Sequence, residues 1–189
     1  MSGTSNAQRI LAALDSRLNA IVELTLYGRA ALHLGFPNPP EEFALSLDVG
    51  AVFWLGQAQE LADRSNFWDA VERTNLELAE QGLYASHFFE ETQVILRPSW
   101  RQARIRIPGN WKRLHIWRLS DPDLLLSKLM RDDPQDQRDA FFIVEAGHLT
   151  NESIREALAQ ARVPDIAEIR EQFERCGKKL LGRLGKQAQ

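Results

Sequence analysis

Four charged side chains crowd one short segment of the sequence. Lys128, Arg131, Asp136 and Asp139 lie on both sides of a predicted helix–helix corner at Pro134. At about 100° per residue, the two cations fall about 60° apart on one helical face. Asp139 opens the apolar run DAFFIV, so its carboxylate needs a cationic or hydrogen-bonding partner near buried surface. Such a set can bind an anion and a metal ion, and it can equally form a structural ion pair.

The same corner carries the signals of two helix starts. Ser120, followed three residues later by Asp123, predicts a cap for the first helix. Asp133 and Pro134 predict the start of the second helix, with Asp136 at its third position. Capping alone would account for these acids. The residue types therefore leave a capped, ion-paired corner and an anion-and-metal site as equal alternatives.

A glycine and an aspartate at predicted strand ends supply a second candidate site. Residues 21–27 read as a strand that ends at Gly28, and a short helix follows. This turn can present backbone N–H groups and the positive end of a helix dipole to a phosphate. Asp48 lies in the next predicted strand, where a carboxylate could hold Mg²⁺ beside that phosphate. The alternative is an ordinary turn glycine and a strand-end aspartate.

The composition is that of a globular protein. The chain has 189 residues, of which 44% are hydrophobic and 26% charged, which is enough to bury one full core. No apolar run approaches the ~20 residues of a membrane span. The N-terminus shows no export signal, and the single Cys176 suits a reducing compartment. We therefore expect a cytoplasmic protein without a membrane segment, whose oligomeric state the sequence does not indicate.

Positive charge is concentrated between Thr92 and Ser120, where no acidic residue occurs although the net charge of the chain is −3. Cations and tryptophans alternate there, namely Arg97, Trp100, Arg101, Arg104, Arg106, Trp111, Lys112, Arg113, Trp117 and Arg118. This mixture suits phosphate contact with base stacking, so RNA is a predicted partner of the Arg97–Arg118 segment. The alternative is a solvated hairpin edge that its charges protect from aggregation.

The predicted elements form an α/β half followed by a helical half. Strands are expected at 21–27, 44–53, 88–96, 103–107 and 114–119, and helices at 6–20, 29–34, 57–81 and over most of 121–182. This order lacks the regular strand–helix alternation of a doubly wound sheet. We therefore predict an α+β fold with an α/β core over residues 1–120 and a helical part over residues 121–189.

Taken together, these residues resemble a protein family. The segments that carry the resemblance are LYGRAA at 26–31, SLDV at 46–49, HFFEE at 87–91, VILRPSW at 94–100 and DLLLSKLMR at 123–131 with Asp136 and Asp139. Over roughly residues 22–165, they are similar to an uncharacterised bacterial family. That family is related to the nucleotidyltransferase-fold toxins of abortive-infection, type IV toxin–antitoxin systems. The most specific element is the motif from Lys128 to Asp139.

The resemblance implies a nucleotidyltransferase-like small mixed sheet with flanking helices and a helical C-terminal half. It implies transfer of a nucleotide monophosphate from a nucleoside triphosphate to an RNA or protein hydroxyl, with Mg²⁺. Lys128 would contact a nucleotide phosphate, and Asp136 would serve the incoming hydroxyl or the metal. Gly28, Arg29 and Arg131 would bind the nucleotide. Asp48 would be catalytic and would hold the metal, facing Lys128 across one cleft.

The sequence departs from the family pattern at two places. Members with an intact site have Gly-Gly or Gly-Ser at the turn and Asp-x-Asp in the strand, whereas this chain has Gly28-Arg29 and Asp48-Val49-Gly50. The second metal carboxylate is missing, so Asp48 would hold Mg²⁺ either with waters and nucleotide phosphates or with Glu90 or Glu91 from the third strand. Strand alternation predicts that Gly50→Asp would restore a ligand. The alternatives to an enzyme are a catalytically inactive nucleotide- or RNA-binding module and a protein-interaction component of a toxin–antitoxin system.

Overall fold

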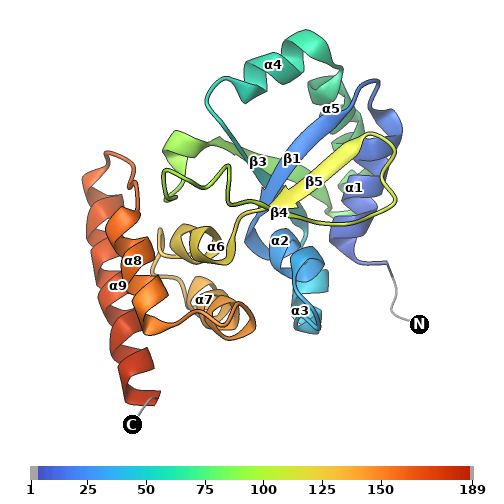
Figure 1. The fold of residues 1–189 in the computed structure, drawn as a ribbon. Helices are drawn as coiled ribbons and strands as arrows, with labels where there is room; N and C mark the ends of the chain where they lie inside the picture. The colour runs from blue at the N-terminus through green and yellow to red at the C-terminus, as the bar shows by residue number, and fades with distance from the viewer. Residues whose placement is uncertain (1–3, 188–189) are drawn as a thin grey trace. The chain divides into compact units, whose positions relative to one another are not determined.

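The computed structural model describes residues 4–187, which form two compact units (Figure 1). The first unit contains the residues up to Glu90 together with Arg104–Arg118, and the second contains Glu91–Ala103 together with the residues from Leu119 on. The α+β class is confirmed, because a mixed sheet is combined with many helices. The predicted division after residue 120 lies close to the change of unit between Arg118 and Leu119. It does not account for residues 91–103, which precede the division but belong to the second unit.

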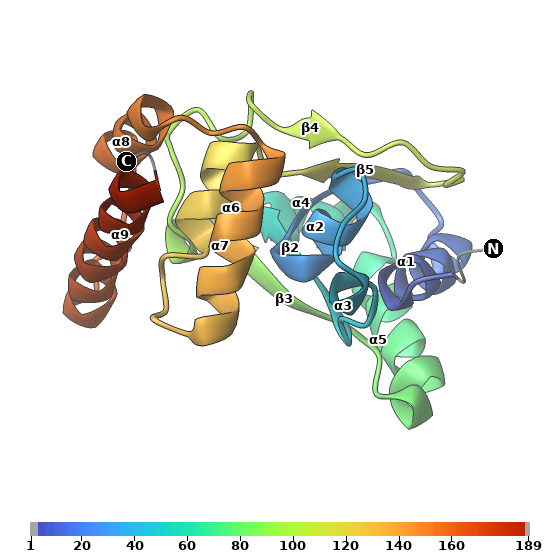
Figure 2. The same ribbon diagram turned by 90° about the horizontal axis from the view of Figure 1, so that it is seen from below.

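A five-stranded mixed sheet lies at the centre of the first unit, with the order β3-β2-β1-β5-β4 (Figure 2). Its strands are β1 (Val22–Tyr27), β2 (Asp48–Phe53), β3 (Tyr84–Glu90), β4 (Ile105–Arg106) and β5 (Leu114–Arg118). Strand β1 is antiparallel to β2 and parallel to β5. Strands β2 and β3 are parallel, and β4 and β5 are antiparallel.

Helices pack against this sheet through the alternating apolar residues of its strands. They are α1 (Asn6–Arg17), α2 (Gly28–Gly35), α3 (Glu41–Ala44), α4 (Gln57–Arg64) and α5 (Phe67–Leu78), followed by the 3₁₀ turn η1 (Ala79–Gln81). Val22, Leu24 and Leu26 are completely buried, as the period of two predicts for one face of β1. Helices α1, α2 and α5 contact β2, β1 and β3, respectively. Ser5 and Gln8 form a reciprocal capping box at the start of α1.

Two predicted strands begin or end elsewhere. The strand expected at 44–53 starts only at Asp48, because residues Glu41–Ala44 form α3. The strand expected at 88–96 is β3 at Tyr84–Glu90, and the 3₁₀ turn η2 (Glu91–Gln93) follows it. The apolar residues 94–96 are buried as part of the second unit rather than paired in the sheet. The apolar character of residues 94–96 therefore reflects burial, and the prediction that they continue a strand is wrong.

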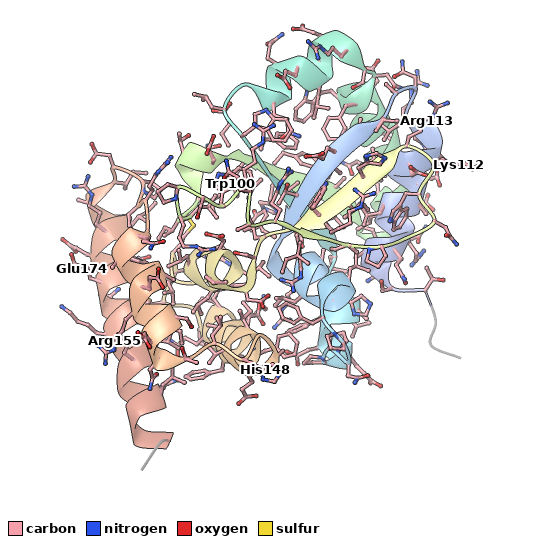
Figure 3. All side chains as sticks on the ribbon, viewed as in Figure 1. Trp100, Lys112, Arg113, His148, Arg155 and Glu174 are labelled. Carbon is pink, nitrogen blue, oxygen red and sulfur yellow. The ribbon has the colours of Figure 1, made fainter. Side chains whose placement is uncertain are left out.

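The second unit is mainly helical. Its helices are α6 (Asp121–Ser127), α7 (Pro134–Ala146), α8 (Asn151–Gln160) and α9 (Ala167–Gln187). Ser120 and Asp133 cap α6 and α7, as predicted from the sequence. Trp100, labelled in Figure 3, is buried in this unit and donates from Nε1 to Glu91 Oε2 at 2.8 Å. Arg97 donates to both carboxylate oxygens of Asp123 in α6, which attaches the 91–103 segment to the helices of this unit.

Candidate functional site

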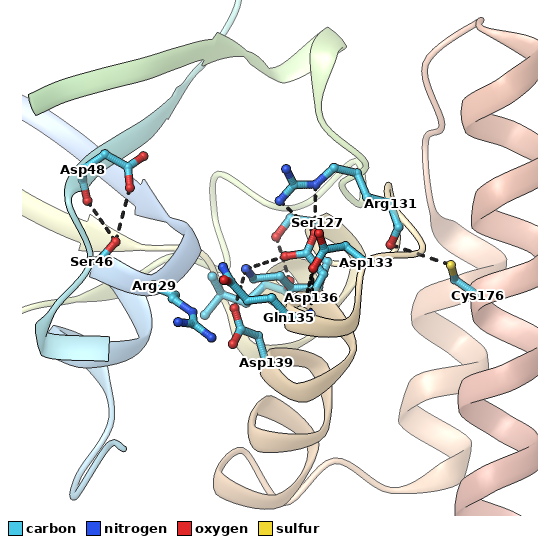
Figure 4. A network of polar contacts seen from close by, with 12 residues as sticks. Arg29, Ser46, Asp48, Ser127, Arg131, Asp133, Gln135, Asp136, Asp139 and Cys176 are labelled. Atoms are coloured by element: carbon cyan, nitrogen blue, oxygen red, sulfur yellow. Dashed lines mark hydrogen bonds and ion pairs between the residues drawn. The ribbon is translucent and has the colours of Figure 1, made fainter. Parts of the chain in front are cut away.

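The α6–α7 corner contains a cluster of charges, which we call the corner cluster: Lys128, Arg131, Asp136 and Asp139, the last three labelled in Figure 4. Lys128 and the two aspartates are buried, whereas the Arg131 side chain is exposed. Lys128 Nζ donates to Asp136 Oδ1 at 2.9 Å and to Asp139 Oδ2 at 2.8 Å. Arg131 Nε donates to Asp136 Oδ2 at 2.8 Å. Asp139 is 0% exposed, Asp136 2% and Lys128 8%. The prediction of a buried, cation-paired Asp139 is therefore confirmed.

The sequence placed Lys128 and Arg131 on one helical face, but the first helix of the corner ends earlier than expected. Helix α6 ends at Ser127, and Lys128 is its C-cap, so the turn rather than a helical face brings Lys128 and Arg131 to the same carboxylate. Asp133 caps α7, and the N–H groups of Gln135 and Asp136 lower the pKa of its carboxyl group. The Lys128 ammonium group is enclosed by two carboxylates. This is the geometry of a structural ion cluster, which fixes the turn between two helices.

The predicted phosphate turn lies at one end of the sheet in the first unit. Strand β1 ends at Tyr27, and α2 begins at Gly28, whose φ is +67°. Among the described residues, no heavy atom lies within 4 Å of the place where a side chain at Gly28 would begin. The left-handed backbone favours glycine, and the open space leaves the turn approachable. These are the features that an anion site at a helix N-terminus requires.

Asp48 lies at the same end of the sheet as Gly28. The antiparallel register pairs Tyr27 with Gly50, so β2 begins with Asp48 where β1 ends. Asp48 Oδ1 accepts a hydrogen bond from Ser46 Oγ at 3.2 Å. Its side chain is 43% exposed. The structure thus brings together two of the residues that the sequence nominated for one site.

His87 joins Asp48 at this end of the sheet. Its Nδ1 lies 3.0 Å from Asp48 Oδ2 and 3.0 Å from Ser86 Oγ. His87 has a φ of +57°, at an irregularity in the pairing of β2 with β3. A non-glycine residue in this conformation is strained, and such strain is concentrated at functional sites. Both neighbours contact the same ring nitrogen, so the group is not a serine–histidine–aspartate triad, which uses both nitrogens.

The sequence did not single out His87 for this position. An isolated histidine in a strand carries no local signal of a carboxylate partner, because the partner comes from another strand. The irregular register between Val49 and Ala51 is what places His87 beside Asp48. Only the three-dimensional pairing of the strands could have identified it.

Glu90, one of the carboxylates proposed to complete a metal site, does not lie beside Asp48. Because β2 and β3 are parallel, Asp48 pairs with Tyr84 and Glu90 with Phe53, at the opposite end of both strands. At about 3.3 Å per residue, roughly 16 Å of strand separates the two carboxylates. Glu91 accepts the indole hydrogen bond in the second unit. Within residues 4–187, no three His, Cys, Asp or Glu side chains are grouped as metal ligands.

Gly50 also lacks room for the missing carboxylate. A Cβ atom at Gly50 would lie 2.7 Å from Tyr27 Cε1 and 3.3 Å from the His87 carbonyl oxygen. The Tyr27 ring therefore occupies the space that a side chain at Gly50 would need. Gly50→Asp could therefore place a ligand beside Asp48 only if the Tyr27 ring moves, and restoration of a metal ligand stays a prediction. The residues present thus do not fit an Mg²⁺ site with two strand carboxylates.

Arg29 follows Gly28 in the first turn of α2. Its Nη2 donates to Glu42 Oε1 at 3.2 Å, and its guanidinium carbon lies 5.1 Å from the centre of the Phe43 ring. These contacts hold Arg29 toward α3. The assignment of Arg29 and Arg131 to nucleotide binding, and the cleft between Asp48 and Lys128, stay predictions.

The basic 97–118 segment is divided between the two units. Its first part belongs to the second unit, where Arg97 donates to both Asp123 carboxylate oxygens and this contact raises the Arg97 pKa. In the first unit, Arg118 is buried and lies 4.2 Å above the Phe36 ring. Arg106, Lys112 and Arg113 are exposed. Part of the predicted RNA-binding charge therefore has an internal, structural role.

Comparison with protein-family models, curated proteins and solved structures finds no significant match. None of the helices formed by residues 4–187 has the length and apolar character needed to cross a bilayer.

Proposed function

We propose that this protein binds a nucleoside triphosphate at the end of the sheet where β1 meets α2, in a nucleotidyltransferase-like arrangement. The observation that carries the proposal is the β1–β2 register, which sets the Gly28 turn and Asp48 at the same end of the sheet. A phosphate-binding turn with an aspartate on the adjacent strand is the arrangement that the sequence resemblance implies. We call this group the sheet-end site: Gly28, Asp48 and His87.

Gly28 and His87 have chemical roles in binding phosphate, whereas the Asp48 carboxylate repels it unless a cation lies between them. The amides at the start of α2 and its dipole attract the anion, and Gly28 keeps the backbone accessible. His87 neighbours the Asp48 carboxylate and can reduce its repulsion toward a phosphate when the imidazole is protonated. The exposed position of Asp48 and His87 suits contact with a ligand.

The geometry supports nucleotide binding more strongly than nucleotidyl transfer. Two-carboxylate metal sites hold the metal ions between paired acids, and here the Tyr27 ring fills the space beside Gly50. Glu90 ends its strand far from Asp48. We therefore expect binding that does not depend on Mg²⁺, with transfer that is slow or below detection.

Calorimetry with ATP, GTP, CTP and UTP, in EDTA and in Mg²⁺, tests the binding proposal. At least one nucleotide should bind, and its affinity in EDTA should remain within about threefold of that in Mg²⁺, because the site supplies few metal ligands. Gly28→Ala should weaken binding through the strained turn. Gly182→Ala is the matched control, since Gly182 lies in α9 with open space around it.

A transfer assay separates binding from catalysis. The protein is incubated with each α-labelled nucleoside triphosphate, total RNA, and Mg²⁺ or Mn²⁺. If none of the four nucleotides binds, the proposed function is excluded. Strong metal-dependent labelling that Asp48→Ala abolishes would instead identify an active nucleotidyltransferase with a further metal ligand.

A further inference from the structure

Strands β4 and β5 present cations and an indole ring on one face of the sheet. The antiparallel register pairs Arg106 with Trp117, and directly paired residues lie on the same face. His115 precedes Trp117 by two positions on β5 and therefore shares that face. Leu114 and Ile116, which alternate with His115 and Trp117 along β5, are buried on the other face. Arg106 and His115 are exposed.

Arg104 is held in place among these side chains by contacts within the first unit. Its Nη1 donates to Glu23 Oε1 at 2.6 Å and to Thr25 Oγ1 at 3.0 Å. Its guanidinium carbon lies 5.0 Å from the centre of the Trp117 ring and 5.9 Å from that of Trp54. Polar and cation–π contacts thus fix a guanidinium group and an indole ring before any ligand arrives.

Arg106 approaches the same indole ring and is available to solvent. Its guanidinium carbon lies 5.4 Å from the centre of the Trp117 ring. We call Arg104, Arg106, His115 and Trp117 the arginine–tryptophan face. The loop before β5 adds exposed Lys112 and Arg113, both labelled in Figure 3.

The strands and loop that form this face carry cations without acidic residues of their own, and the acids that contact them, Glu23 and Asp15, come from β1 and α1. Between Arg104 and Arg118 the sequence contains no acidic residue. Glu23, which pairs with His115 in the sheet register, already accepts from Arg104. The exposed cations therefore attract polyanions, while the part of the indole ring that stays exposed can contact an unpaired base.

We propose that the arginine–tryptophan face binds single-stranded nucleic acid. Bases stack on Trp117 beside the Arg106 guanidinium group, and Lys112 and Arg113 contact phosphates. Base planes are accessible for stacking in a single strand and are covered in a duplex. This binding involves base planes and phosphates, which RNA and DNA share, and it does not depend on the proposed nucleotide site.

Fluorescence anisotropy with a labelled oligonucleotide of roughly 16 nucleotides tests this inference. Single-stranded RNA, single-stranded DNA of the same sequence, and the corresponding duplex are compared at several salt concentrations. At least one single strand should bind about tenfold more tightly than the duplex, because stacking contributes in addition to charge. The comparison of RNA with DNA identifies the preferred strand.

Variants assign the binding to this face. Arg106→Glu should weaken binding about tenfold and reduce the salt dependence, because a phosphate contact is replaced by repulsion. Arg73→Glu makes the same charge change at an exposed position on α5 and should have less than about a twofold effect. Trp117→Leu should weaken binding about tenfold with little change in salt dependence.

Two outcomes would overturn the inference. Equal losses from Arg106→Glu and Arg73→Glu would show that only net charge matters. Absence of binding, or equal affinity for the single strand and the duplex, would show that bases do not stack on this face. Thermal unfolding is measured for each variant, and if Trp117→Leu fails to fold, Arg106→Glu and Lys112→Glu at exposed positions decide the result.

Discussion

The corner cluster and the sheet-end site both contain charged residues, yet they differ in how far those charges are buried. In the corner cluster, the ammonium group of Lys128 is enclosed by two carboxylates, and Asp136 and Asp139 are buried. In the sheet-end site, Asp48 and His87 contact each other with 43% and 58% of their side chains exposed. Charges that are buried with partners hold the fold, whereas exposed charges beside strained backbone are available to a ligand.

The comparison predicts that the two sites respond oppositely to mutation. Loss of a charge from the corner cluster should reduce the free energy of unfolding and leave surface binding unchanged in the fraction that folds. Loss of a charge from the sheet-end site should alter binding with little change in stability. The following experiments apply this distinction, beginning with the largest expected effect.

Asp139→Ala should lower the free energy of unfolding by about 3 kcal/mol, because the buried Lys128 ammonium loses one of its two carboxylate partners. Urea denaturation of the wild type and the variant measures the difference. Asp139→Asn keeps an oxygen acceptor and should lose less. A change below about 1 kcal/mol, the usual value for an exposed pair, would show that the corner cluster does not stabilise the helices.

Gly50→Asp should destabilise the protein by about 2 kcal/mol, because its Cβ atom would meet the Tyr27 ring at 2.7 Å. A Tyr27→Ala background removes that ring, so the cost of Gly50→Asp should be smaller in the double variant than in the single one. Urea denaturation of the wild type, the two single variants and the double variant gives the four free energies of this double-mutant cycle. Equal costs in both backgrounds would contradict the packing explanation.

The local parts of the corner cluster could be predicted from the sequence. Ser120 and Asp133 were recognised as caps, because capping depends on residues only two or three positions away. A cationic partner for Asp139, Lys128 or Arg131, was also predicted, since a carboxylate in an apolar helix requires a nearby cation, and Lys128 donates to it. Local signals were sufficient wherever the interacting groups lie within one turn or one corner.

The sheet-end site could be predicted only in part. The Gly28 turn follows from one strand and one helix, and both were recognised. The position of Glu90 depends on the direction and register of β3 relative to β2, which no local pattern specifies. The contact between His87 and Asp48 depends on an irregular step in the same pairing. Residues that meet only through strand pairing were therefore misplaced or missed.

Gly28→Ala should lower the free energy of unfolding by about 1 kcal/mol, because a left-handed φ of +67° is strained for alanine although space is available. Gly182→Ala, inside α9, should be neutral or stabilising by up to about 1 kcal/mol through helix propensity. Thermal unfolding of both variants tests the contrast. Equal effects at the two positions would show that the turn at Gly28 is relaxed in solution.

Asp48→Asn should have the smallest effect on stability and a clear effect on binding. The exposed carboxylate makes a solvent-screened contact with His87, so the free energy of unfolding should change by less than about 0.5 kcal/mol. Removing its negative charge beside a phosphate should tighten nucleotide binding in EDTA by several fold, because the Coulomb repulsion disappears. A charge-matched control is Asp63→Asn, at an exposed position on α4.

The direction of the Asp48→Asn effect decides how the sheet-end site works. Tighter binding in both EDTA and Mg²⁺ would mean that Asp48 opposes the phosphates directly, as a carboxylate without a second acid beside it should. Weaker binding in Mg²⁺ together with unchanged binding in EDTA would mean that Asp48 holds a metal ion brought by the nucleotide. That second result would contradict the metal-independent site inferred from Glu90 and Gly50 and would restore the nucleotidyltransferase interpretation.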